Sequence, residues 1–219
     1  MKKNKIIVIL GPTSSGKSEV AIKLAQKFNG EIISADSRQV YRGMDIGTGK
    51  VEPDLSGEIP QKFSSGKFYA ESPYMSGGIA HYLIDIANPK TEYNAANFKN
   101  DANKIIEDIL KRKKLPIICG GTGFWIKAIV DNVNFPKVKP DKELRKILEK
   151  KNAEELFKTL RELDSERANN IDAKNKVRLI RAIEICKAIG KVPKIIIQNE
   201  RYYFLQIGIN TPKEELHKK

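Results

Sequence analysis

The octapeptide GPTSSGKS at Gly11–Ser18 constrains the fold of this chain more than any other feature of its sequence. It has the spacing G-x-x-x-x-G-K-[ST], follows the apolar run Ile6–Leu10 and opens a helical pattern at Lys17. In such a strand–loop–helix unit, backbone N–H groups and the helix dipole point at one bound anion. We therefore predict a phosphate-binding loop made of Gly11, Pro12, Thr13, Ser14, Ser15, Gly16, Lys17 and Ser18. Lys17 would reach the terminal phosphate, and the Ser18 hydroxyl would hold Mg²⁺.

Short apolar runs alternate with helical patterns along most of the chain. The expected strands are Ile6–Leu10, Glu31–Ala35, His81–Ile86, Leu115–Cys119 and Tyr202–Ile209. The expected helices are Lys17–Phe28, Ala95–Lys111, Gly123–Val130, Lys142–Lys150, Ala153–Leu163 and Asn175–Ile189. This alternation predicts an α/β fold, a parallel sheet of the P-loop NTPase type with flanking helices. Right-handed crossovers then bring the loops that follow the strands to one edge of the sheet, where ligands bind.

Two regions interrupt the alternation of strands and helices. Residues 51–78 are rich in Gly, Pro and Ser and show little periodicity, which predicts a flexible excursion. Residues 131–172 carry charged helical patterns, which predict a small helical insert. The expected organisation is a core of residues 1–130, the insert, and a return to the core over residues 173–219, with an RNA-contacting helix and the last strand.

The formal net charge of +13 favours a polyanionic partner, above all nucleic acid, although a lysine-rich surface without such a partner is an open alternative. The apolar runs are far shorter than the ~20 residues of a membrane span. The basic, then apolar N-terminus continues into the phosphate loop and not into a cleavage site, so we expect a cytoplasmic protein. Cys119 and Cys186 lie far apart without a CxxC pair, which indicates reduced thiols and neither zinc nor a disulfide.

Polar residues follow the second expected strand, at Asp36, Ser37, Arg38 and Gln39. Asp36 would lie at the sheet edge of the phosphate loop, where it could take a proton from a nucleophile. The Gln39 amide has the donor and acceptor that a base edge requires. The alternative is that Asp36 and Ser37 cap a helix and Gln39 lies on the surface. In a kinase or NTPase, Asp36 or Asp85 would instead serve Mg²⁺ and water.

Two later segments also carry chemistry. Thr122 in the turn GGTG would present its hydroxyl at the same edge as Asp36, or would only cap the following helix. Phe124 and Trp125 behind it are expected in the core. Arg178 and Arg181 share one helix face, which suits phosphates or an RNA backbone, or a salt-bridged surface.

In this order, the segments resemble the tRNA dimethylallyltransferase family, also called tRNA isopentenyltransferase. The family pattern is GPTxSGK[ST], ISxDSxQVYRGMDIGTxK, H[HY]LID, GGTG and [RK]xxRA[IL]E. The matching segments here are Gly11–Ser18, Ile33–Lys50, His81–Asp85, Gly120–Gly123 and Arg178–Glu184. The string DSRQVYRGMDIGTGK is the most discriminating of them.

The resemblance implies transfer of a dimethylallyl group from dimethylallyl diphosphate to N6 of the adenosine just 3′ of the anticodon in certain tRNAs. The phosphate loop, Lys17 and Mg²⁺ would then neutralise the leaving diphosphate. Asp36 would accept the proton of the adenine amine, and Thr122 would orient that amine. Contacts with the anticodon arm are implied at Asp36, Ser37, Arg38, Gln39, Val177, Arg178, Leu179, Ile180 and Arg181.

Members of this family are typically about half as long again, and continue past the position of Lys219 into helices that help grip the anticodon arm. A tRNA-binding module without full catalysis is therefore one alternative, and a small-molecule P-loop kinase is another. We expect a monomer.

Overall fold

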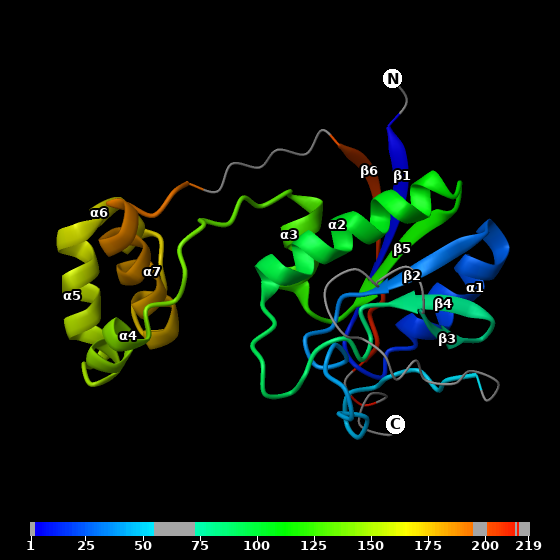
Figure 1. The fold of residues 1–219 in the computed structure, drawn as a ribbon, viewed down its shortest axis with the longest axis horizontal. Helices are drawn as coiled ribbons and strands as arrows, with labels where there is room; N and C mark the ends of the chain where they lie inside the picture. Colours follow the sequence, from blue (N-terminus) through cyan, green and yellow to red (C-terminus); the bar gives the residue numbers. More distant parts are fainter. Residues whose placement is uncertain (1–2, 55–72, 195–200, 213, 215–219) are drawn as a thin grey trace. The chain divides into compact units, whose positions relative to one another are not determined.

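The chain divides into two compact units in the computed structural model shown in Figure 1. The structure describes residues 3–54, 73–194, 201–212 and 214. The α/β unit comprises Met1–Val133 and Ile197–Lys219, and the helical unit comprises Asn134–Ile196. Each unit has its own hydrophobic core.

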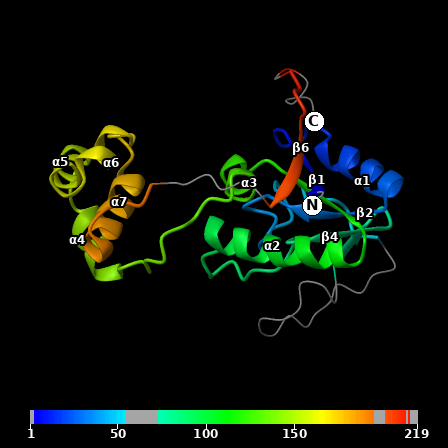
Figure 2. The ribbon, with the colours of Figure 1, turned by 90° about the horizontal axis from the view of Figure 1, so that it is seen from above.

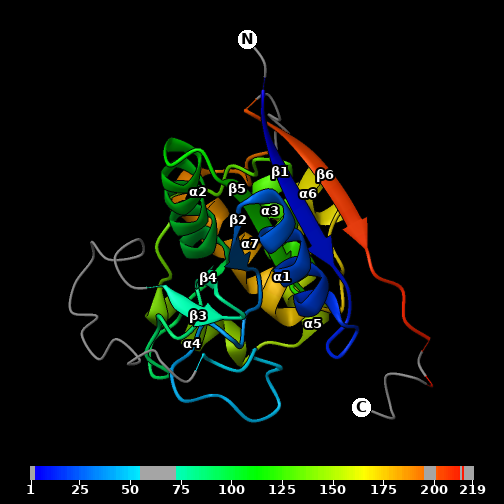
Figure 3. The same ribbon diagram turned by 90° about the vertical axis from the view of Figure 1, so that its right-hand side faces the viewer.

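The α/β unit is built on a six-stranded sheet in the order β3-β4-β2-β5-β1-β6. The strands are β1 (Asn4–Leu10), β2 (Gly30–Ser34), β3 (Tyr74–Ser76), β4 (Ile79–Tyr82), β5 (Leu115–Gly120) and β6 (Tyr202–Gly208). All neighbouring strands are parallel except β3, which forms an antiparallel hairpin with β4. Figure 3 shows β6 beside β1, at the edge of the sheet opposite the hairpin. The predicted parallel sheet is confirmed.

Helices cover both faces of this sheet, as Figure 2 shows for α1 (Lys17–Phe28) and α2 (Ala95–Lys111). Ala21 and Ala25 of α1 pack on one face, against Ile9, Ile32, Ile117 and Cys119. The other face is covered by α2, which also packs against α3 (Gly123–Val130). These three helices have the predicted bounds, because their apolar spacing and end residues are local signals.

A buried carboxylate fastens α2 to the sheet at the edge where β2 and β5 begin. The two terminal nitrogens of Arg112 each lie 2.6 Å from the Glu31 carboxylate, which also accepts from Lys114 and from the Tyr82 hydroxyl. Burial raises the pKa of Glu31, but the hydrogen bonds from Arg112, Lys114 and Tyr82 outweigh it and hold that pKa at about 2. This ion cluster is structural and lies at the edge away from the phosphate loop.

The region between β2 and β4 differs from the sequence prediction. The expected strand His81–Ile86 ends at Tyr82, because Leu83 and Asp85 adopt positive φ values of 63° and 55° that no regular strand allows. Strand β3 lies in the region predicted to be a flexible excursion; its three residues are too few to give a periodic signal. Residues 55–72 of that predicted excursion lie outside the described residues.

The helical unit contains four helices among its described residues. They are α4 (Lys142–Glu149), α5 (Ala153–Leu163), α6 (Ser165–Asn169) and α7 (Lys176–Ile189). Leu156 and Leu160 of α5 pack against Leu179 and Ile183 of α7, and all four are fully buried. The helical unit therefore extends well beyond residue 172, and α7 belongs to it and not to a return segment of the core. The apolar face of α7 is what decides this, since it is buried against α4 and α5.

No helix in the described part of the chain is long and apolar enough to cross a membrane.

Candidate active site at the carboxyl edge of the sheet

Three loops meet at the carboxyl edge of the sheet, because they follow the neighbouring strands β1, β2 and β5. They are the phosphate loop (Gly11–Ser18), the loop 36–50 and the turn 120–123. The Thr122 N–H donates to the Ala35 carbonyl over 3.1 Å, and the Ser37 N–H donates to Thr122 Oγ1 over 2.9 Å. A Cβ added at Gly121 would lie 3.4 Å from the Gly11 carbonyl oxygen and 4.0 Å from Asp36 Oδ2. The three loops thus form one site, as the topology predicted.

The phosphate loop has the expected curled backbone. Gly16 adopts φ 82° just before α1 begins at Lys17, a conformation that favours glycine. Lys17 is buried, and its ammonium donates to the Pro12 carbonyl over 3.0 Å, so it spans the loop that it closes. The Ser15 hydroxyl is buried and finds no hydrogen-bond partner among the described residues. Lys17 and the N-terminus of α1 together favour an anion in this loop.

Asp36 and Thr122 each keep one acceptor for a ligand. Asp36 Oδ1 accepts from the N–H groups of Arg38 and Gln39, which leaves Oδ2 on the side of Gly121. Thr122 Oγ1 accepts from the Ser37 N–H and donates to the Ser37 hydroxyl. Since a hydroxyl has two lone pairs, Thr122 can accept one more hydrogen. A carboxylate and a hydroxyl with free lone pairs at one edge suit an amine donor.

The glycines of the turn 120–123 have different surroundings. A Cβ added at Gly120 would lie 2.2 Å from the Ala35 carbonyl oxygen, so only glycine allows β5 and β2 to run this close. A Cβ at Gly123 would meet nothing within 4 Å. Gly120 is therefore needed for packing within the protein, because its close neighbour is the Ala35 backbone.

The Gln39 side chain is buried and fully used inside the protein, which corrects the expectation that it contacts a base. Its Oε1 accepts from the Ser34 hydroxyl over 2.8 Å. Its Nε2 donates to the carbonyls of Thr48 and Gly49 over 3.2 and 2.8 Å. Both donors of this amide are used, and its oxygen is buried, so Gln39 closes the loop 36–50 on itself.

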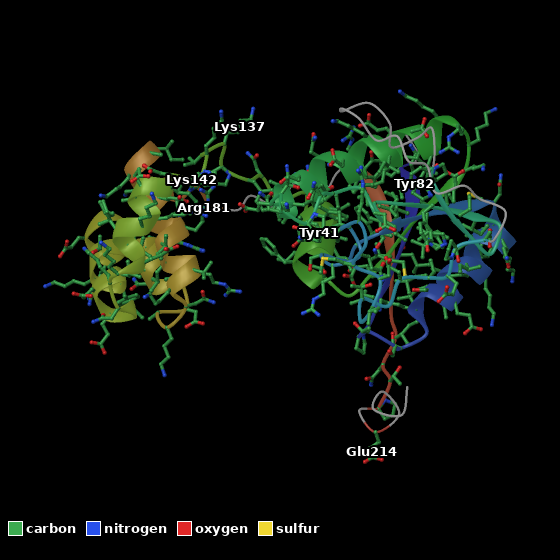
Figure 4. All side chains as sticks on the ribbon, turned by 60° about the horizontal axis from the view of Figure 1, so that its bottom comes forward. Tyr41, Tyr82, Lys137, Lys142, Arg181 and Glu214 are labelled. Atoms are coloured by element: carbon green, nitrogen blue, oxygen red, sulfur yellow. The ribbon has the colours of Figure 1, made fainter. Side chains whose placement is uncertain are left out.

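Further contacts make the loop 36–50 a folded element. The Lys50 side chain is buried and donates to the Tyr41 carbonyl, to Asp45 and to Asp85. Asp85 is thus paired with a lysine, which argues against it as a magnesium ligand. Tyr41, labelled in Figure 4, also forms a bridge with Ala87. The sequence signal for this fold is the glycine series Gly43, Gly47 and Gly49, all of which adopt positive φ.

Cys119 lies beneath the phosphate loop, within hydrogen-bonding reach of the Ser18 hydroxyl and near Lys17. Burial raises the pKa of its thiol to about 11, although Lys17 and Ser18 act in the opposite direction. Both cysteines are free and buried. A neutral, buried thiol has no nucleophilic character at neutral pH and is part of the core.

The second predicted RNA-contacting segment, 177–181, serves mainly the core of the helical unit. Leu179 and Ile180 are buried there, which corrects their assignment as RNA contacts. Arg181 donates to the Glu184 carboxylate and to the Val138 carbonyl, both over 2.7 Å, and Figure 4 shows it beside the stretch that carries Lys137 and Lys142. The salt-bridged alternative therefore applies to Arg181.

Glu184 is the buried centre of this ion cluster. Arg145 donates two hydrogen bonds to it, and the Asp141 N–H donates a third. Burial raises the pKa of Glu184, but the hydrogen bonds from Arg145 and Arg181 outweigh it and hold the pKa at about 2.

Two of the predicted RNA contacts, and Phe124 near Thr122, do face solvent. Arg178 is exposed, and Val177 is 78% exposed, at the first turn of α7. Phe124, expected in the core, is 56% exposed, whereas Trp125 is buried and stacks on Phe98 with 4.7 Å between ring centroids. Neighbouring residues of a helix point about 100° apart, so the first turn of α3 can bury Trp125 and leave Phe124 exposed, which local hydrophobicity does not predict.

A phosphate loop after β1 of a parallel sheet, with Asp36 and Thr122 on adjacent strand ends, defines a protein of the P-loop class. A family model described as IPP transferase matches residues 69–219, and one described as isopentenyl transferase matches residues 4–58. Because the first match covers more than half of the chain, this chain belongs to the IPP transferase family.

Individual relatives agree with this assignment. The chain is 39% identical over 216 residues to a tRNA dimethylallyltransferase of Leuconostoc mesenteroides, covering 99% of this chain and 66% of that protein. It is 40% identical over 224 residues to one of Acetivibrio thermocellus, covering 98% and 65%. The chain thus spans just under two thirds of the length of these curated relatives.

Solved structures show the same fold. A tRNA delta(2)-isopentenylpyrophosphate transferase of Staphylococcus epidermidis superposes with a TM-score of 0.57 at 39% identity, over 99% of this chain and 66% of that one. A eukaryotic dimethylallyltransferase, described as acting on tRNA, superposes with a TM-score of 0.75 at 28% identity, over 98% and 50%.

Proposed function

We propose that this chain transfers a dimethylallyl group from dimethylallyl diphosphate to N6 of the adenosine 3′ to the anticodon of a tRNA. The observation that carries the proposal is the junction of the three loops, where Asp36 and Thr122 lie beside the phosphate loop. The named activity of the relatives and the positive net charge of +13 support it.

The acceptor side of the reaction rests on Asp36 and Thr122. The adenine amine donates one N–H to the remaining lone pair of Thr122 Oγ1, which fixes its direction. Asp36 Oδ2 takes the proton that the amine loses when its nitrogen bonds to the allylic carbon. The base must leave its stack to reach this edge, and the contacts of the pocket offset that cost.

The donor side rests on the phosphate loop. As the allylic carbon–oxygen bond breaks, negative charge grows on the departing diphosphate. The loop N–H groups, the N-terminus of α1 and the Lys17 ammonium would neutralise this charge and so stabilise the leaving group. Lys17 would exchange its Pro12 carbonyl for a diphosphate oxygen.

Mg²⁺ fits this site through hard oxygen donors. Within the described ranges no group of three or more His, Cys, Asp or Glu side chains could hold a metal ion. Mg²⁺ at phosphate sites needs only one or two protein oxygens, because the substrate supplies others. Ser18 Oγ is the donor we assign, and bound Mg²⁺ would supply further charge neutralisation on the diphosphate.

RNA contacts outside the pocket are assigned to exposed residues only. Ser37 and Arg38 directly follow Asp36 in the loop 36–50, and Val177 and Arg178 lie on the first turn of α7. Arg178 would pair with the phosphate backbone, which positions the anticodon arm without reading its sequence.

The test incubates the chain with Mg²⁺, labelled dimethylallyl diphosphate and an adenosine-rich anticodon stem-loop. Label on the RNA supports the proposal. Phosphoryl transfer from ATP to a small acceptor, without label on RNA, would establish a kinase instead. RNA binding without transfer would establish a binding module that needs a further segment for catalysis.

A further inference from the structure

The loop 36–50 carries an apolar tip that its fold does not use. Ile46 is 99% exposed, more than any other large apolar side chain in the described part of the chain, and Met44 beside it is partly exposed. An exposed side chain of this kind does not stabilise the folded unit, because an apolar side chain contributes to folding free energy only when it is removed from water. An isolated exposed Ile needs no explanation, but one held out on a braced loop next to a catalytic edge does.

The residues around Ile46 are held in place, so its outward direction is fixed by the fold. The Thr48 hydroxyl donates to the carbonyls of Met44 and Asp45, at 2.8 and 3.1 Å. The Asp45 carboxylate, on a largely exposed side chain, accepts from the buried Lys50 ammonium over 2.7 Å. Gly47, with φ 73°, supplies the turn that follows the tip.

This tip belongs to the same edge as the site. Gly49, three residues after Ile46, lies against the phosphate loop, since a Cβ there would be 3.2 Å from the Thr13 methyl group. The Gln39 amide ties Thr48 and Gly49 to the turn that begins at Asp36. An RNA loop that delivers a base to Asp36 and Thr122 therefore approaches past the tip.

We propose that Ile46, with Met44 beside it, inserts into the base stack of the RNA loop and occupies the place that the acceptor adenine leaves. Apolar side chains act in this way when proteins unstack base steps, at a cost of a few kcal/mol per step. Because the loop already holds Ile46 in place, its insertion would lose little conformational entropy. Ile46 is thus a positioning residue for the acceptor base. This inference rests on the proposed function, because it presupposes an RNA base that must leave its stack.

The dimethylallyl tail of the donor is the other apolar group in the reaction, and it does not suit Ile46. A donor pocket encloses its ligand, whereas Ile46 is exposed on all sides. If Ile46 acts on the base stack, its replacement affects the RNA substrate. If it contacts the dimethylallyl tail, its replacement affects the diphosphate donor.

The experiment compares the wild-type chain with Ile46→Ala and the conservative Ile46→Leu. One stem-loop carries 2-aminopurine, which fluoresces when unstacked, at the acceptor position; a second carries adenosine and is used for transfer. We expect Ile46→Ala to lose most of the fluorescence rise on binding and to lower kcat/KM for the stem-loop by about tenfold. The KM for dimethylallyl diphosphate stays unchanged, and Ile46→Leu restores both signals.

Phe28→Ala is the matched control, since Phe28 is a half-exposed apolar residue at the far end of α1, about 17 Å along the helix from Lys17. It should leave fluorescence and transfer unchanged. Wild-type fluorescence with Ile46→Ala, or a change confined to the donor KM, overturns the wedge. If the wild-type chain unstacks the base without transferring label, only the proposed transfer fails; if it never unstacks the base, the wedge fails as well.

Discussion

The Ser37 N–H donates to the Thr122 hydroxyl over 2.9 Å and joins two strand-end loops that lie 85 residues apart in the sequence. Because the strands before them, β2 and β5, are neighbours, this contact sets the distance between the loop 36–50 and the start of α3. The same hydroxyl is the one assigned to the acceptor amine, so its removal should affect function more than stability.

Replacing Thr122 with Val keeps the shape but removes the hydroxyl. We expect turnover with the stem-loop to fall on the order of 10–100-fold, because the amine loses its orienting acceptor. Stability should fall by about 1 kcal/mol, the net value of one hydrogen bond. Single-turnover transfer and urea unfolding measure the two effects. Thr122→Ser, which keeps the hydroxyl, should retain most activity; equal losses in both variants would contradict the assignment.

Asp36→Asn tests the proton acceptor without disturbing the turn. The amide oxygen can still accept from the N–H groups of Arg38 and Gln39, so the loop should fold as before. We expect kcat to fall roughly 10²–10⁴-fold, the usual value of a general base, while the RNA dissociation constant stays within about twofold. Rapid-quench transfer and filter binding supply the numbers. A variant with undiminished turnover would show that another group accepts the proton.

Gln39→Ala should act on the fold of the loop and not on RNA directly. The change leaves the Ser34 hydroxyl and the carbonyls of Thr48 and Gly49 without their partner in a buried place. We expect a loss of about 2–3 kcal/mol in unfolding free energy, from urea denaturation. Arg38→Ala, at an exposed neighbour, should leave that energy unchanged. An unaltered stability together with weakened RNA binding would favour the original base-contact prediction.

Arg178 and Arg181 should respond in opposite ways to truncation. Arg181→Ala removes one partner of the buried Glu184 carboxylate and should cost about 2–3 kcal/mol of stability with an unchanged salt slope of RNA binding. Arg178→Ala should keep stability and lower that salt slope by roughly one unit, since one phosphate contact is lost. Binding measured between about 50 and 200 mM salt separates the two. Identical salt slopes for Arg178→Ala and the wild type would show that Arg178 makes no contact with an RNA phosphate.

The buried His81 should make stability depend on pH. Burial lowers the pKa of His81 from 6.5 to about 4, against smaller raising effects from the Ser76 backbone and Asp54. The unfolded chain therefore takes up this proton near pH 6.5, while the folded chain resists it until about pH 4. The stabilising contribution is complete above pH 6.5 and is lost as the pH falls from 6.5 to 4, by up to ~1.4 kcal/mol per pH unit.

Urea unfolding of the wild type and of His81→Gln, from pH 7.5 to pH 5 as a practical range, isolates this contribution. The difference between the two should shrink as the pH falls. Parallel curves would show that His81 has the same pKa in the folded and the unfolded chain, and would contradict the effect of burial.

Local sequence determined much of this protein. The bounds of α1, α2 and α3 and the phosphate loop follow from periodicity and glycine spacing, which act between near neighbours. The parallel sheet follows from the alternating order of strands and helices. The meeting of Asp36 and Thr122 with the phosphate loop was also predictable, because parallel strands bring their carboxyl ends to one edge.

Tertiary structure decided the roles of several polar residues, because hydrogen-bond partners and burial depend on segments that are distant in sequence. Gln39 and Arg181 are residue types that often contact RNA. In this structure, however, the Gln39 amide donates to the carbonyls of Thr48 and Gly49, and Arg181 donates to the buried Glu184 carboxylate. The membership of α7 in the helical unit follows from which apolar face finds a partner, and its own sequence does not specify that partner. The exposure of Ile46 depends on tertiary contacts in the same way, because the bonds of Thr48 and Lys50 hold this apolar residue out in solvent.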